Sequence, residues 1–161
     1  MYAAEDADPQ HLRLPEPGAV VLLGDLARPD LLTVGALRGW PERAAEVGFE
    51  CSGSGTRRHR FQGPLLYDVL TAAGPAFGPG GRRERLRFPV TVTGRDGHRA
   101  LLSWAEIDPD FGGAPVLPAT RIDGVPLGAA GPQPVLPQDR RGARHISGIT
   151  AVGVEGYLPA R

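Results

Sequence analysis

The stretch from Glu50 to Arg60 reads Glu-Cys-Ser-Gly-Ser-Gly-Thr-Arg-Arg-His-Arg, and the fold and the function can be argued outward from it. It holds the only cysteine of the chain, followed by glycines, arginines and a histidine. Cationic neighbours lower the pKa of a thiol and favour the thiolate, which is a ligand for soft or high-valent metals. A lone cysteine is about as often a small buried hydrophobic residue. On local chemistry, both interpretations of Cys51 stay open.

The basic run after the cysteine, residues 57–60, is suited to binding an oxyanion. Planar guanidinium groups make paired hydrogen bonds to phosphate or carboxylate. The alternative is a solvated edge strand with outward charges. In a strand, successive side chains point to opposite faces. Arg58 and Arg60 would then share one face, and Arg57, His59 and Phe61 the other, so His59 is expected to face inward with Phe61.

A second basic cluster, residues 139–145, reads Asp-Arg-Arg-Gly-Ala-Arg-His. Glycine lets the backbone approach a ligand closely, and the arginines supply contacts to an anion. A surface turn with dispersed charge is the alternative. The two clusters support each other only if the fold brings them together, which the sequence does not reveal.

The totals indicate one globular domain. A chain of 161 residues is long enough for a moderate core. Its 18 basic and 18 acidic residues balance, so no net field favours nucleic acid or an anionic membrane. The sequence contains 23 glycines and 17 prolines, but its apolar residues fall in clear runs between them, which indicates a loop-rich domain rather than a disordered chain. One cysteine excludes an internal disulfide and a Cys-rich zinc site.

The first residues, MYAAEDADPQ, lack the basic start and apolar stretch of a signal peptide. No apolar run approaches the roughly 20 residues that span a bilayer. We therefore expect a soluble, cytoplasmic protein with no membrane association. Residues 1–17 are expected to form a flexible arm, and residues 18–161 a single domain.

Local patterns predict short strands and helices in the first half of the chain. Thr33 is placed to cap a helix that Pro41 stops. The segments on either side of the Cys51 loop predict a wide hairpin. Pro64 opens a helix with Leu65 and Leu66 on its apolar face. The expected elements are strands at 19–23, 31–33, 42–51 and 58–61, and helices at 34–40 and 64–73.

In the second half, Asp96-Gly97 predicts a hairpin turn, and Ser103 and Glu106 have the spacing of a capping box. The expected strands are 86–93, 98–102, 115–121 and 145–154, with a flexible loop at 74–84 and a proline-limited edge piece at 134–137. Short strands mixed with few helices predict an α+β fold: one compact domain with mixed β-sheets.

Read together, several segments resemble the oxidoreductase molybdopterin-binding domain of the sulfite oxidase family, as a short bacterial member. The resemblance covers roughly residues 20–156 and rests on the order and spacing of the pieces. They are Phe49-Glu50-Cys51-Ser52-Gly53, the helix segment 61–74, Asp96-Gly97-His98, Pro115 to Ala119, Asp123 to Leu127, Gly131 to Pro137 and Arg144 to Ile149.

The resemblance implies a sulfite-oxidase-type fold and a small oxidoreductase domain that transfers an oxygen atom or electrons at a molybdenum centre. Cys51 would be the metal ligand, and the Arg and His groups would face the pterin phosphate or a small anionic substrate. The catalytic residues implied are Cys51, His59 and His145. Those implied to bind the cofactor are Ser52, Gly53, Arg57, Arg58, Arg140, Arg144 and Ser147.

The chain departs from the family pattern at three places. No Arg/His motif precedes residue 45, no lysine lies near the end, and Gln133-Pro134 stand where the family has an arginine. An alternative is therefore a cofactor-free enzyme or small-molecule-binding protein of bacterial secondary metabolism with the same fold. A third interpretation is an accessory subunit that needs a partner. The substrate and the oligomeric state stay open.

Overall fold

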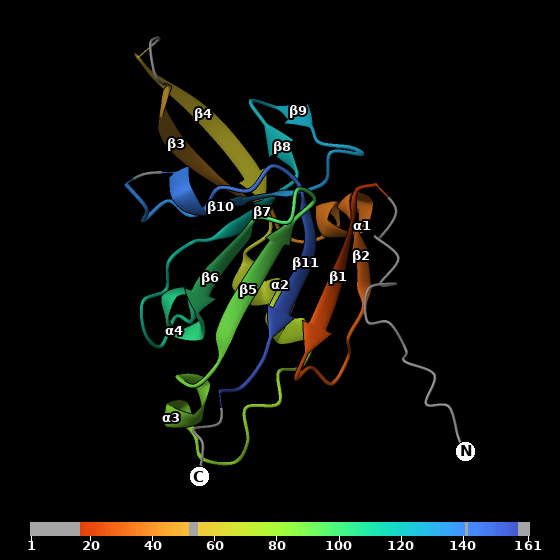
Figure 1. Cartoon of the computed structure of the whole chain (residues 1–161), viewed down its shortest axis with the longest axis vertical. Coiled ribbons are helices and arrows are strands. Elements are labelled where there is room, and N and C mark those ends of the chain that lie inside the picture. Colours follow the sequence, from red (N-terminus) through yellow and green to blue (C-terminus); the bar gives the residue numbers. More distant parts are fainter. Residues whose placement is uncertain (1–16, 52–54, 141, 158–161) are drawn as a thin grey trace, which may run out of the picture.

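Residues 17–51, 55–140 and 142–157 are described by a computed structural model, and they build three β-sheets with short helices between them (Figure 1). The largest sheet has five strands in the order β2-β1-β11-β5-β6. Strand β1 runs parallel to β11, and the other neighbours are antiparallel. The first and last strands of the fold therefore lie side by side. The bounds are β1 Ala19–Gly24, β2 Leu31–Thr33, β5 Pro89–Gly94, β6 Arg99–Ser103 and β11 Ile149–Val154.

The β5–β6 hairpin forms where the Asp-Gly signal predicts it. Gly97 has a φ of 84°, a left-handed conformation that favours glycine. Val90 and Val92 are buried at 0% and 1% exposure, and across the hairpin Ala100 and Leu102 are buried as well. The alternating residues between them are more exposed, so one face of the hairpin is apolar and covers the core.

The main core lies between the large sheet and two helices, α2 (Leu66–Ala72) and α4 (Trp104–Ile107). Leu70 from α2 and Trp104 from α4 are fully buried against the strands. The predicted capping box at α4 is confirmed, because the backbone N–H of Ser103 donates to the Glu106 carboxylate at 2.9 Å. Thr33 caps α1 (Val34–Arg38) as predicted, accepting from the Ala36 N–H at 3.0 Å.

A four-stranded sheet, β3-β4-β8-β9, and a two-stranded sheet, β10-β7, build a second core around Phe61, Leu117, Ala119 and Val135. Gly63 ends β4 where a Cβ atom would lie 2.6 Å from the Pro118 carbonyl oxygen, so only glycine allows this approach of β4 to β7. The bounds are β3 Arg43–Cys51, β4 Gly55–Gly63, β7 Leu117–Ala119, β8 Arg121–Ile122, β9 Val125–Pro126 and β10 Gln133–Val135.

Several predicted elements have different bounds in the structure. The predicted loop at 74–84 runs into a short helix, α3 (Arg82–Arg85), which leaves Leu86 exposed instead of on the buried face of a strand. The predicted strand at 115–121 is divided into β7 and β8. The last strand begins only at Ile149, since Gly142–Arg144 forms a 3-10 turn, η1, and Gly148 has a φ of 95°. No helix in the described parts of the chain is long and apolar enough to cross a membrane.

Candidate functional site: the β3–β4 hairpin and the 139–145 loop

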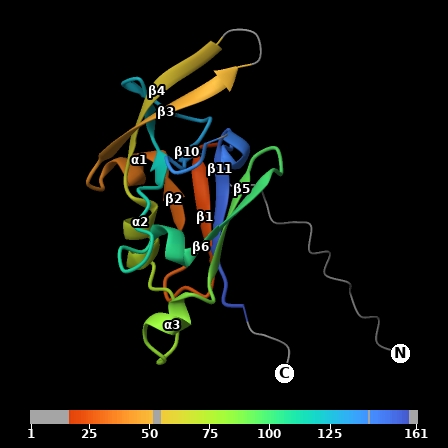
Figure 2. The ribbon, with the colours of Figure 1, turned by 90° about the vertical axis from the view of Figure 1, so that its left-hand side faces the viewer.

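The site begins with the long hairpin of β3 and β4, which extends beyond the rest of the fold (Figures 1 and 2). The two nine-residue strands pair without a break from Arg43↔Gly63 to Cys51↔Gly55. The predicted hairpin is confirmed, but its connection is narrower than predicted, because β4 begins at Gly55 and not at residue 58. Cys51 belongs to the last pair, at the end of the hairpin. Ser52 and Gly53, which were predicted to bind a cofactor, lie outside the described residues.

The alternation predicted for residues 57–61 is confirmed at its inner end. Phe61 is 2% exposed and belongs to the second core. His59 is half-buried and makes an edge contact with the Phe61 ring, with 6.3 Å between the ring centroids. Arg57, Arg58 and Arg60 are exposed. Within the described part of the chain these three guanidinium groups form no ion pair, so they are available to an anion.

His59 is held by the carboxylate of Asp123, which was not predicted as a site residue. Asp123 accepts a hydrogen bond from Nδ1 of His59 at 2.6 Å and another from the Arg60 N–H at 2.9 Å. These bonds lower the pKa of Asp123, with His59 as the larger cause. Asp123 has a φ of 50° in the turn between β8 and β9. Its separation of 64 residues from His59 hides the pair from sequence reasoning.

In the second basic cluster, Arg144 is already engaged. Its guanidinium donates two parallel hydrogen bonds to Asp139, at 2.8 and 2.6 Å, and a third to Glu106 at 3.0 Å. The bonds from Asp139 and Glu106 raise the pKa of Arg144, and Arg144 in turn lowers that of Asp139. Burial alone would raise the pKa of Glu106, but its bonds to Arg144 and to the Ser103 N–H hold it below the usual value. The charge of Arg144 is thus matched within the protein.

The other predicted residues in and beside this loop differ in burial and in contacts. His145 is half-buried and contacts the Phe61 ring edge-on at 6.3 Å between centroids. Burial lowers the pKa of His145, so its neutral form is favoured. Arg140 is exposed and has no ion-pair partner among the described side chains. Ser147 is exposed and does not line the pocket described next.

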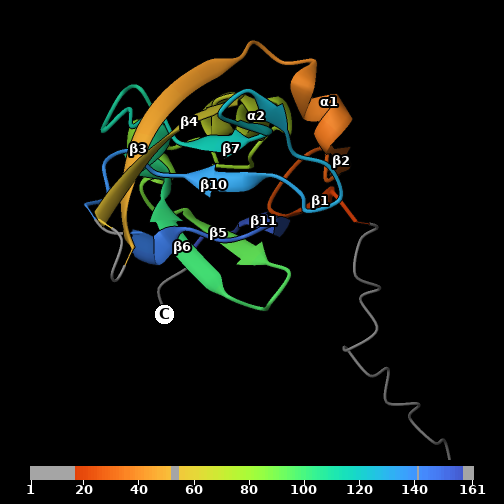
Figure 3. The same cartoon turned by 90° about the horizontal axis from the view of Figure 1, so that it is seen from above.

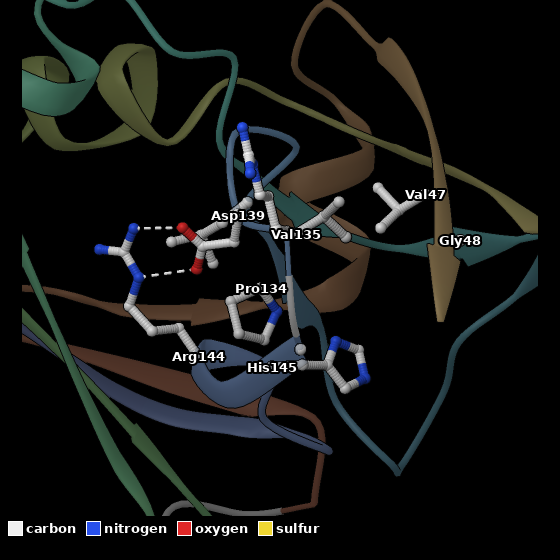
Figure 4. Close-up of a pocket in the computed structure, with 10 residues that line it drawn as sticks. Val47, Gly48, Pro134, Val135, Asp139, Arg144 and His145 are labelled. Atoms are coloured by element: carbon white, nitrogen blue, oxygen red, sulfur yellow. Dashed lines mark hydrogen bonds and ion pairs between the residues drawn. The ribbon is translucent and has the colours of Figure 1, made fainter. Parts of the chain in front are cut away.

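The fold places the 139–145 loop beside β3 of the hairpin, and none of the basic residues 57–60 lines the pocket between them. Val47 and Gly48 of β3 face Pro134, Asp139, Arg144 and His145 across a small pocket (Figure 4). Seen from above, β3 and β4 arch over the strand β10 that leads into this loop (Figure 3). The volume of the pocket is about 20 Å³, which is room for about one water molecule.

The residues of the hairpin and of the pocket differ in how well they suit a molybdopterin cofactor. The donor set at the hairpin suits it chemically, because a cysteine thiolate and unpaired guanidinium groups are ligands for a soft metal and for a phosphate. The pocket does not suit it, since a cofactor of this size needs several hundred Å³. Among the described side chains no three of His, Cys, Asp or Glu are grouped as around a metal ion, but a centre held by one thiolate needs no such group. The residues of the hairpin therefore suit molybdopterin, whereas the pocket is too small for it.

Comparison with known proteins defines the class of fold. No family model matches the sequence, and no curated protein matches it. Among solved structures, the chain is similar to the sulfane dehydrogenase SoxCD from Paracoccus pantotrophus, with a TM-score of 0.66 and 16% sequence identity. The match covers 85% of this chain and 38% of that chain. It confirms the predicted α+β fold of the sulfite oxidase type, and at this identity it shows the fold alone.

Proposed function

We propose that this chain is a small molybdopterin-dependent oxidoreductase domain whose working site is the end of the β3–β4 hairpin. The observation that carries the proposal is the position of Cys51. It stands in the last pair of a long hairpin, within a fold shared with SoxCD over 85% of the chain. The sequence around Cys51 resembles the segment that carries the metal-binding cysteine in the sulfite oxidase family.

In this proposal each group has a separate task. The Cys51 thiolate holds the metal, and the exposed Arg57 and Arg58 bind the cofactor phosphate or an anionic substrate. Asp123 fixes the proton of His59 on Nδ1, which leaves the other ring nitrogen to accept or return a proton. When bound, the molybdenum group would supply oxygen-atom or electron transfer. Arg144 positions the 139–145 loop, because its guanidinium is engaged by Asp139 and Glu106.

The experiment is elemental analysis with a visible absorption spectrum, on protein from a host that makes molybdopterin. We expect stoichiometric molybdenum in the native protein and its loss in Cys51→Ser. Leu86→Ser is the control, because Leu86 is exposed directly after α3, outside the hairpin and the 139–145 loop. Native protein without molybdenum, or a Cys51→Ser protein that keeps it, would contradict the proposal.

A second candidate is a cofactor-free domain that binds a small anion at the hairpin. It rests on the pocket of about 20 Å³, which is too small for the cofactor, and on the internally matched charge of Arg144. On this candidate, protein free of molybdenum binds sulfate or phosphate in a calorimetric titration. Replacing Arg57 and Arg58 together by Gln would abolish that binding, and Arg43→Gln at the opposite end of the hairpin would leave it unchanged. Equal binding by the doubly substituted protein would refute this candidate.

A further inference from the structure

A larger cavity lies apart from the hairpin, and it is lined by residues from the start of β1, strand β2, helix α1 and the segment after β9. Its volume is about 350 Å³, within the range of small-molecule sites. None of the residues that line it belongs to the site described above. An inference from this cavity is therefore independent of the proposed function.

Two of the residues that line the cavity are glycines at positions where the backbone conformation does not require glycine. Gly35 lies in helix α1, where glycine lowers helix stability, and a Cβ atom there would meet only the Thr33 hydroxyl at 3.7 Å. Gly128 would meet nothing within 4 Å. Neither has the left-handed φ that would favour glycine. Since both line the cavity, a large side chain at Gly35 is expected to reduce its volume.

The walls of the cavity are mostly apolar, and one of the apolar side chains is exposed to solvent. Leu31 of β2 is 53% exposed, although it faces this cavity together with Val34 and Leu127. An exposed leucine beside a concave apolar surface gains by contact with an apolar ligand, since that contact removes both surfaces from water. This wall is thus suited to binding the apolar part of a small molecule.

One cation completes the lining. The Arg38 guanidinium donates one hydrogen bond to the Leu127 carbonyl oxygen at 2.6 Å. Within the described residues no carboxylate pairs with it. Its remaining N–H groups are free to make the parallel bonds that a carboxylate accepts. A cation without a counter-ion beside an apolar wall selects an anion that carries an apolar body.

We propose that this cavity binds a small aliphatic carboxylate, with its carboxylate on Arg38 and its hydrocarbon chain against Leu31 and Val34. The probe is hexanoate, added to the full ¹⁵N-labelled chain and followed by NMR. We expect the amide resonances of Gly18, Gly35 and Gly128, which line the cavity, to shift and saturate. Hexanamide, which lacks the charge, should bind at least about tenfold more weakly, since a charged hydrogen-bond partner is worth about that factor.

Two sets of variants keep the proposal falsifiable. Arg38→Gln should weaken hexanoate binding about tenfold and leave hexanamide binding unchanged. Gly35→Leu should abolish binding by filling the cavity, whereas the matched Gly35→Ala should retain it. Gly35→Ala should unfold at or above the native temperature, because a Cβ atom there meets no atom closer than 3.7 Å. Thermal unfolding of Gly35→Leu shows that this variant is folded when its binding is measured. Native-like hexanoate binding by Gly35→Leu or Arg38→Gln, or resonance shifts that avoid the cavity, would overturn the proposal.

Discussion

Arg144 was predicted to contact an anion outside the protein, and its guanidinium contacts carboxylates of the chain. A guanidinium group in a glycine-containing loop can bind an anion from outside the protein or a carboxylate of the same chain. Only the fold shows which of the two it binds. Here the anions are Asp139, five residues away, and Glu106, 38 residues away. The side chain is 26% exposed, so solvent screens these bonds only in part. Arg144 thereby fastens the 139–145 loop to α4.

Replacing Arg144 by Gln should lower the free energy of unfolding by about 2 kcal/mol, because it leaves two partly buried carboxylates without their charged donor. Arg144→Lys should recover only part of this loss, since an ammonium group cannot make the parallel pair of bonds. Urea denaturation measures both. The matched control is Arg140→Gln in the same loop, where an exposed, unpaired arginine should change stability by less than about 0.5 kcal/mol. An equal loss in both Gln variants would contradict this assignment.

At the scale of the elements, the parts predicted best are those with local causes. The Thr33 cap, the Asp96-Gly97 turn and the Ser103–Glu106 capping box each depend on residues a few positions apart, and all three formed. Helix α3 was not predicted, because its support is distant: Arg85 donates to Asp108 and Asp110, beyond β5 and β6. Tertiary ion pairs of this kind leave no local pattern.

In the candidate site, too, the features with local causes were predicted and those that depend on distant residues were not. The hairpin, and the inward position of His59 beside Phe61, came from strand alternation. The Asp123 carboxylate that holds His59 could not be found, because an Asp-Gly pair reads as a turn whatever its side chain contacts. The approach of His145 to Phe61 was equally out of reach, because it depends on how separate sheets pack.

Asp108 ties α3 to α4, and its removal should be costly. It is 1% exposed and accepts from the Trp104 indole at 2.8 Å and from Arg85 at 2.6 Å. Asp108→Ala leaves the Trp104 indole without its acceptor and removes one of the two carboxylates that Arg85 contacts, so it should lower the free energy of unfolding by about 3 kcal/mol. Asp108→Asn keeps an acceptor for the indole and should lose less. Urea denaturation with tryptophan fluorescence measures both, and an Asn variant less stable than the Ala variant would show that the lost acceptor is not the cause.

At the scale of the whole molecule, these ion pairs connect pieces that the sheets leave separate. The parallel pairing of β1 with β11 joins the first two strands of the large sheet to the other three. Asp123 joins β4 to the β8–β9 turn, and Arg144 joins the 139–145 loop to Glu106 of α4. The carboxyl groups involved are ionised in the folded protein. The stability of the whole fold should therefore depend on pH.

The direction follows from the pKa values. Glu106, Asp108, Asp123 and Asp139 have a lowered pKa in the folded protein, so the unfolded chain binds more protons near pH 4. Their contribution is present above about pH 5 and lost as pH falls through the folded values. Burial lowers the pKa of His145, so the unfolded chain also binds more protons just below about pH 6.5. Stability should thus decrease from about pH 6.5 downward, and more steeply below about pH 4.

Urea denaturation between pH 3 and pH 8 tests this order, with each variant compared with the native protein at the same pH. His145→Gln should remove part of the decrease between about pH 6.5 and pH 5 and leave the acid part intact, because the carboxylates keep their partners. Arg144→Gln should flatten the acid part, since the pKa of Asp139 and Glu106 would return toward the unfolded values. A His145→Gln protein with the native slope in the upper range would show that another histidine carries it, and a native curve without an acid decrease would contradict the role of the ion pairs.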